Sequence, residues 1–141
     1  MLTMLHVLAT KGSAVWSIRP EAPVFEGLQL MAEKDIGALL VMERGKPVGL
    51  LSERDYTRKV VLRRRSSHDT PVRHIMSSPV SVTCDCSVDA CMAIMTSSRT
   101  RHVLVMDDVQ LRGLVSIGDL VKATIEDQQF TIVHLEQYIS S

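Results

Sequence analysis

Apolar and polar positions follow the same order twice along the 141-residue chain. When the sequence is shifted by 64 residues against itself, SIRPEAPVFEGLQLMAEKDIGALLVMERGKPVGLLSERD lies without a gap over SVTCDCSVDACMAIMTSSRTRHVLVMDDVQLRGLVSIGD. A long register without gaps predicts an internal structural repeat. Identical pairs recur along it, among them Ser17/Ser81, Val41/Val105, Gly49/Gly113, Ser52/Ser116 and Asp55/Asp119.

Each copy predicts the element order strand, helix, strand, strand, helix. In the first helix Val24, Leu28 and Met31 stand at i, i+4 and i+7, which gives one buried stripe, and the second copy repeats this spacing. The expected positions are strands near 16–18 and 80–82, helices over 23–34 and 87–97, strand pairs joined by turns at Arg44-Gly45 and Asp107-Asp108, and closing helices that begin after Ser52 and Ser116.

One such unit would bury little surface alone, so we expect two related units that complete each other's core by packing sheet to sheet, in an α+β fold. The polar, proline-punctuated stretch between them reads as a linker. The division expected from the sequence is an N-terminal segment (1–13), repeat 1 (14–62), a linker (63–75), repeat 2 (76–126) and an amphipathic C-terminal helix (127–141).

Charge and composition narrow the functional classes. Sixteen basic residues balance sixteen acidic ones, so neither general nucleic-acid binding nor attachment to an anionic membrane is favoured. The apolar runs are too short to span a bilayer, and the N-terminus lacks signal-peptide features. Together with an odd count of three cysteines, this predicts a cytoplasmic setting with free thiols. The C-x-C-x4-C spacing of these cysteines is poor for zinc, so no metal site is expected.

The repeated Gly-Leu-apolar-Ser-x-x-Asp stretch allows two interpretations. As a capping box, the serine caps the following helix and the aspartate lies in its first turn. As a ligand site, the same helix N-terminus and serine hydroxyl would donate to a phosphate, and the aspartate would accept from the two hydroxyls of a ribose. The glycines would either relieve crowding in the strand or leave room for a base or sugar.

No catalytic arrangement is legible. The sequence contains no complete Walker loop, no G-x-G-x-x-G and no G-x-S-x-G. We therefore expect a protein that is not an enzyme. Two alternative functions are kept: an enzyme that acts on a nucleotide, and an adaptor that binds nucleic acid or protein through the basic triplet at 63–65.

The doubled pattern resembles a pair of CBS domains, the Bateman module, over residues 14 to 126. The narrower likeness is to small stand-alone bacterial CBS-pair proteins, and it is carried by TKGSAVWSI, GALLVMERGKPVGLLSERDYTRKV, TPVRHIM, RHVLVM and GLVSIGDLVKA. The resemblance implies a sensor of AMP, ADP, ATP, NAD(H) or S-adenosyl compounds, bound in clefts between the halves of a module that pairs into a homodimer and signals to an effector protein.

Carried over by position, the resemblance assigns roles to both copies. Asp55 and Asp119 would hold ribose, and Ser52 and Ser116 would lie beside phosphate. The remaining residues would line the base or phosphate side: Ser17, Ile18, Ser81 and Val82 on the first strands, and Gly37, Ala38, Leu39, Thr100, Arg101, His102 and Val103 entering the second strands.

The two copies differ inside the motif. Arg54 stands opposite Gly118, and Arg101 stands opposite Gly37. These arginines, joined by Lys11, are candidate cations for phosphate. The sequence therefore predicts two unequal sites, of which the more cationic one holds a longer phosphate group, such as that of a dinucleotide.

Overall fold

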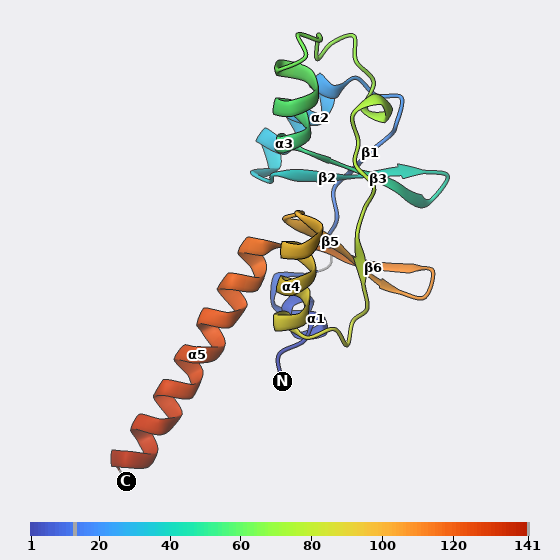
Figure 1. The fold of residues 1–141 in the computed structure, drawn as a ribbon. Helices are drawn as coiled ribbons and strands as arrows, with labels where there is room; N and C mark the ends of the chain where they lie inside the picture. Colours follow the sequence, from blue (N-terminus) through green and yellow to red (C-terminus); the bar gives the residue numbers. More distant parts are fainter. Residues whose placement is uncertain (13, 141) are drawn as a thin grey trace. The chain divides into compact units, whose positions relative to one another are not determined.

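The computed structural model describes residues 1–12 and 14–140, and it divides into two compact units (Figure 1). One unit is Val15–Pro79, which holds the first repeat. The other combines Met1–Ala14 with Val80–Ser141, so the first residues of the chain fold together with the second repeat.

The unit Val15–Pro79 contains one mixed three-stranded sheet. Its strands lie in the order β1-β2-β3, with β1 parallel to β2 and β2 antiparallel to β3. The elements are β1 (Ser17–Ile18), α2 (Val24–Lys34), β2 (Ala38–Glu43), β3 (Lys46–Ser52), α3 (Glu53–Tyr56), the π-helical turn η1 (Thr57–Val61) and the 3-10 turn η2 (Val72–His74).

The second repeat has the same topology, with the order β4-β5-β6. Its elements are β4 (Ser81–Val82), α4 (Val88–Ser98), β5 (His102–Asp107), β6 (Gln110–Ser116) and α5 (Ile117–Ser140). The expected α+β fold of two strand-helix-strand-strand-helix repeats is therefore confirmed. Even the left-handed backbone positions repeat at the same spacing: Asp35 with Arg99 after the first helices, and Arg44 with Asp108 in the hairpin turns.

Each core is completed by a segment from outside its repeat. The N-terminal helix α1 (Met4–Lys11) is fixed to the loop after β4, because the amide of Met4 donates to the Cys86 carbonyl at 2.9 Å. In the other unit, the stretch after η1 is the added segment. It is fixed to the loop after β1, where the Val72 amide donates to the Ala22 carbonyl at 2.8 Å. The two cores accordingly include Met4 and Val7 in one unit and Val72 and Ile75 in the other.

The strand glycines make room for these added segments. A Cβ on Gly113 would lie 2.5 Å from Cδ2 of Leu8, and one on Gly49 would lie 2.8 Å from Cγ of Met76. Both distances are too short for real Cβ contacts, so each glycine allows a side chain from outside the repeat to pack on the strand. This supports the interpretation that the glycines relieve crowding.

Two local expectations were wrong. The second hairpin turns at Asp108-Val109 and not at Asp107-Asp108, because β5 continues through Asp107, which pairs with Gln110. The closing helix of repeat 2 and the C-terminal helix are one continuous element of 24 residues, α5. No residue in its sequence stops the helix, since the junction around 126–128 holds neither proline nor glycine.

Candidate functional site

The first copy of the motif is a complete capping box. The Asp55 amide donates to Oγ of Ser52 at 3.0 Å, and the Ser52 amide donates to Oδ2 of Asp55 at 3.1 Å. These bonds satisfy backbone donors at the start of α3, for which the helix has no internal partner. The capping interpretation of this motif is confirmed, and the ligand interpretation stays a prediction.

The Asp55 carboxylate is enclosed by its own unit. Oδ2 also accepts from Oγ of Ser52 at 2.9 Å, while Oδ1 accepts from Oγ of Ser77 at 2.7 Å and lies 3.0 Å from Nζ of Lys59. Lys59 in turn donates to the carbonyl of Ile75 at 2.9 Å. With its side chain only 9% exposed, Asp55 ties α3 and η1 to the segment that returns past β3.

The second copy caps α5 in the same way but is more open. The Asp119 amide donates to Oγ of Ser116 at 3.1 Å, and the Ser116 amide donates to Oδ2 of Asp119 at 2.8 Å. The cation that pairs with Asp119 is Lys11, which is far away in sequence. Nζ of Lys11 lies 2.6 Å from the same Oδ2 and donates to the Leu114 carbonyl at 2.5 Å. The Asp119 side chain is 25% exposed and that of Lys11 is 33% exposed.

The electrostatics around Asp119 follow from this arrangement. Burial alone would raise the pKa of Asp119, but hydrogen bonds from Lys11 and Ser116 outweigh it and lower that pKa below its ordinary value. Burial lowers the pKa of the neighbouring His102, and the positive charges of Lys11 and Arg101 act in the same direction. The carboxylate is thus held charged and the imidazole is held neutral at neutral pH.

The strand residues expected beside a ligand gather next to each motif within its own unit. Ala38 pairs with Ser52 across the sheet, and the Glu53 amide donates to the Gly37 carbonyl at 3.1 Å. In the second repeat His102 pairs with Ser116, and the Ile117 amide donates to the Arg101 carbonyl at 2.9 Å. The start of one strand therefore meets the end of the next and the following helix.

Four of the expected side chains face the core of their own unit. Ile18, Leu39, Val82 and Val103 are buried in the two cores, and Ala38 is 2% exposed. Only the backbone of the four core residues can face a bound molecule. Ser17 and Ser81 lie on exposed faces of the first strands, where they pair with Leu40 and Leu104. Thr100 donates from Oγ1 to the His102 carbonyl at 3.0 Å.

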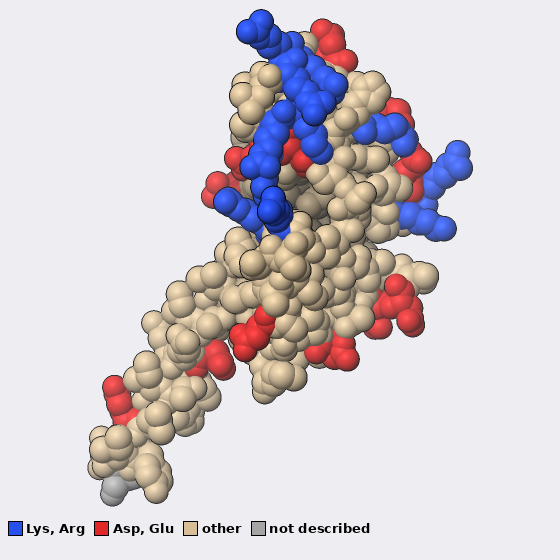
Figure 2. All heavy atoms as spheres, viewed as in Figure 1, with Lys and Arg blue, Asp and Glu red and all other residues tan. Residues whose placement is uncertain are grey.

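The positive charge is concentrated in one unit. Val15–Pro79 holds eleven of the sixteen Lys and Arg residues against eight Asp and Glu, whereas the other unit holds five against eight. In Figure 2, blue side chains crowd over the part of the molecule where α3 and η1 lie. Arg54, Arg58 and Arg63–Arg65 of this region are all exposed. In the other unit, Arg101 is exposed beside the motif, and Gly118 provides no side chain there.

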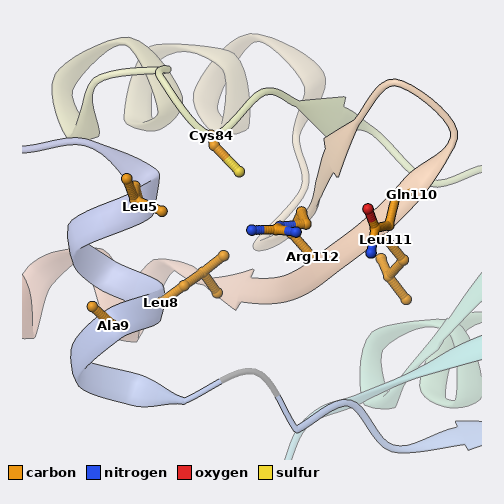
Figure 3. Close-up of a pocket in the computed structure, with 7 residues that line it drawn as sticks. All are labelled: Leu5, Leu8, Ala9, Cys84, Gln110, Leu111 and Arg112. Carbon is orange, nitrogen blue, oxygen red and sulfur yellow. The ribbon is translucent and has the colours of Figure 1, made fainter.

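Among the described residues, two surface hollows can be compared with the motifs, and neither is lined by Asp55 or Asp119. One of about 510 Å³ is lined in part by Gly37, Glu53 and Tyr56. The other, of about 430 Å³, lies between α1 and the start of β6, where Leu5, Leu8 and Arg112 face it (Figure 3). The second hollow is at the opposite end of β6 from Ser116.

Sequence reasoning missed Ser77 as a partner of Asp55, and it assigned Lys11 to phosphate without its partner Asp119. Ser77 stands 22 residues from Asp55 and Lys11 stands 108 residues from Asp119. Neither pairing has a local spacing signal. These two pairings could have been expected only if it were known that each repeat needs an added segment to complete its core.

The described residues include no group of three His, Cys, Asp or Glu side chains that could hold a metal ion. Burial raises the pKa of Cys91 to about 11, and burial with the nearby Asp85 also raises that of Cys86. These thiols are therefore protonated at neutral pH and poor nucleophiles. Along 1–12 and 14–140, no helix combines the length and apolar character needed to cross a membrane.

Comparison with known proteins adds a family match. The model of the CBS domain matches residues 11–62 and 72–126. The chain is 34% identical over 134 residues to the CBS domain-containing protein CBSX3, mitochondrial, of Arabidopsis thaliana. The alignment covers 91% of this chain and 65% of the plant protein, so the chain spans about two thirds of that relative's length.

Solved structures with the same fold include a putative signal-transduction protein with CBS domains from Burkholderia ambifaria. It is 46% identical, has a TM-score of 0.85, and the match covers 92% of this chain and 98% of that one. A CBS domain protein from Pyrobaculum aerophilum, complexed with AMP, is 27% identical with a TM-score of 0.74. That match covers 84% of this chain and 89% of the archaeal protein.

Proposed function

Because the chain belongs to the CBS-domain family, we propose that it is a non-catalytic regulatory module that binds an adenine nucleotide of the AMP, ADP, ATP or NAD(H) class. In this proposal it acts in the cytoplasm as a homodimer and signals energy or redox state to an effector protein. The AMP complex of the Pyrobaculum aerophilum relative supports this class of ligand.

The observation that carries the proposal is the arrangement at Asp119. A charged, partly exposed carboxylate stands at the start of α5, with Ser116 in front of it and the ammonium group of Lys11 2.6 Å away. A carboxylate accepts well from the two hydroxyls of a ribose, and a lysine with a helix N-terminus attracts phosphate. When a ribose takes the acceptor that Lys11 now uses, Lys11 becomes available to the phosphate.

The two motifs differ in how strongly their aspartates are already bonded. Asp55 already accepts from Ser52 and Ser77 and is paired with Lys59, so a ribose would have to break contacts that hold its unit together. We therefore assign ribose binding first to Asp119. The arginines near α3, Arg54 and Arg58 among them, would serve the longer phosphate chain of an ATP or a dinucleotide.

The test is calorimetric titration of the purified protein with AMP, ADP, ATP and NAD(H), combined with a thermal-shift assay. A nucleotide at a hundred times its dissociation constant should add about 2.7 kcal/mol of stability. Chromatography of the same samples reports any turnover. No binding by any of these nucleotides would overturn the proposal, and conversion of a nucleotide to product would favour the enzyme.

Matched substitutions locate the site. Asp119→Ala should weaken nucleotide binding at least about tenfold while the fold is retained. Asp55→Ala is the matched control, since it removes the same group from the same motif position, and Asp55→Asn preserves more of the local bonding. Equal loss of binding at Asp119→Ala and Asp55→Asn would contradict the assignment of ribose to Asp119.

The exposed arginines favour one competing function, an adaptor for polyanions. Arg58 and Arg63–Arg65 are all exposed in the unit Val15–Pro79. A protein that neutralises several phosphates binds nucleic acid with a steep dependence on salt. Fluorescence anisotropy with labelled single-stranded and duplex oligonucleotides tests this: tight, salt-dependent binding in the absence of nucleotide binding would favour the adaptor.

A further inference from the structure

The distal part of α5 presents apolar side chains to solvent. Its first turns are anchored in their own unit, where Leu120 is fully buried and Ile117 and Ala123 pack against the core. Every residue from 125 to 140 is exposed, and in Figure 1 the helix extends away from the rest of its unit. In proteins most of the stability of a helix comes from the packing of its apolar face, so this exposed stretch would gain stability from a partner.

Five of the exposed apolar residues of α5 fall in a heptad pattern, whereas Phe130, Val133 and Tyr138 lie off it. Positions 118, 121, 125, 128, 132, 135 and 139 alternate by three and four residues, which is the repeat of a coiled-coil seam. Five of these seven are Val, Ile or Leu, and their exposed fractions are 45% for Val121, 49% for Ile125, 54% for Ile132, 56% for Leu135 and 81% for Ile139. Gly118 and Gln128 complete the set.

We propose that this seam, defined as residues 118, 121, 125, 128, 132, 135 and 139, pairs two copies of the chain as a parallel two-stranded coiled coil. The proposal rests on the homodimer proposed above and names its interface. The first seam position is isoleucine at 125, 132 and 139, and the second is valine, glutamine and leucine at 121, 128 and 135. A β-branched residue at the first position with leucine at the second favours two parallel strands, and the heptad of Ile132 and Leu135 has this combination.

Gln128 decides the direction of the helices. In a parallel pair in register, Gln128 of one copy faces Gln128 of the other, and the two amides can hydrogen-bond to each other. In an antiparallel pair, Gln128 would instead face Ile132, and its buried amide would lack a partner, which is costly. The antiparallel pairing would gain a contact between Lys122 and Glu136, but an exposed ion pair contributes little.

The charges beside the seam are compatible with a second copy. The flanking positions are Lys122, Thr124, Gln129, Thr131, Glu136 and Tyr138. In the parallel register these bring Thr124 opposite Gln129 and Thr131 opposite Glu136, so no like charges face each other. Glu126 and Asp127 lie on the outer side of the helix, and the seam itself carries no charge.

The area is that of a modest dimer. Covering the five exposed Val, Ile and Leu side chains of both copies removes on the order of 500 Å² of apolar surface from water. A specific interface buries about 1,200 Å² or more in total, so the flanking side chains must supply the rest. A reversible dimer with a dissociation constant on the order of micromolar is the expected result.

The experiment is sedimentation equilibrium of the full chain from about 1 to about 100 μM, on the wild type, Ile132→Glu and Val133→Glu. The two substitutions are adjacent, and both sites are about half exposed, at 54% and 50%, but only Ile132 is in the seam. Ile132→Glu should weaken dimerisation at least about tenfold, and Val133→Glu should leave it within about twofold. Circular dichroism confirms that each variant is folded.

A cysteine cross-link tests the direction. Gln128→Cys should form an intermolecular disulfide under mild oxidation, whereas Phe130→Cys, which lies off the seam, should not exceed the wild-type background. A monomeric wild type would overturn both the homodimer and the seam. A wild-type dimer that Ile132→Glu leaves intact, or that does not cross-link at position 128, would overturn the seam alone. Nucleotide titration of the same samples shows separately whether the ligand proposal stands.

Discussion

The buried carboxylate of Asp55 should matter more for the stability of its unit than Asp119 does for the other. Asp55→Ala removes half of a capping box, worth about 1 kcal/mol. It also removes the acceptor of the Ser77 hydroxyl, another 1 kcal/mol or so. It leaves the partly buried Lys59 without its carboxylate, which adds roughly 0 to 1 kcal/mol. The expected loss of unfolding free energy is therefore about 2–3 kcal/mol.

The assay is urea unfolding followed by tryptophan fluorescence. Trp16 is the only tryptophan of the chain and lies in the same unit as Asp55, with Nζ of Lys34 4.2 Å from its ring centroid. With a slope of about 1 kcal/mol per molar urea for a unit of this size, the midpoint should fall by about 2–3 M. Asp55→Asn should lose less, since its amide oxygen can still accept from Ser52. A midpoint shift under about 0.5 M for Asp55→Ala would refute the reasoning.

Two further predictions concern the other unit. Gly113→Ala should cost about 1–3 kcal/mol because its Cβ meets Leu8, and Leu8→Ala should recover part of that loss; equal stability of Gly113→Ala and wild type in urea unfolding monitored by circular dichroism would be inconsistent with the packing described. Because burial lowers the pKa of His102 in the folded state, the unfolded chain binds a proton more readily, so stability should fall as the pH drops below about 6.5. His102→Gln should flatten that part of the stability curve, and an unchanged curve would show that His102 is not its source.

The repeat made much of the fold predictable. Because the two copies align at a constant shift of 64 residues, the strand ends and helix starts expected in one copy are expected at the matching positions of the other. The motif serines and aspartates form the expected caps for the same reason. The roles of Gly49 and Gly113 were not predictable in detail, since the side chains that pack on them, Met76 and Leu8, come from outside the aligned repeats.

The environments of the two aspartates were likewise beyond sequence reasoning. Positions 55 and 119 are both aspartate, and the sequence does not indicate that Ser77 and Lys59 enclose one carboxylate while Lys11 binds the other. These are long-range contacts, and a pattern analysis sees only local spacing. The inequality predicted from Arg54 and Arg101 concerned cations, whereas the clearer structural difference is in how each aspartate is already bonded.

The place of α1 has a consequence for how the chain is made. Residues 15–79 are contiguous, so every residue of their unit is present as soon as that stretch leaves the ribosome. Met4, Val7 and Leu8 are synthesised well before the rest of the core that they enter, which is built from residues 80 to 120. At about 5–20 residues per second, these apolar side chains wait several seconds or longer for that core. During that interval Met4, Val7 and Leu8 have no core to pack on, and transiently exposed apolar side chains favour aggregation.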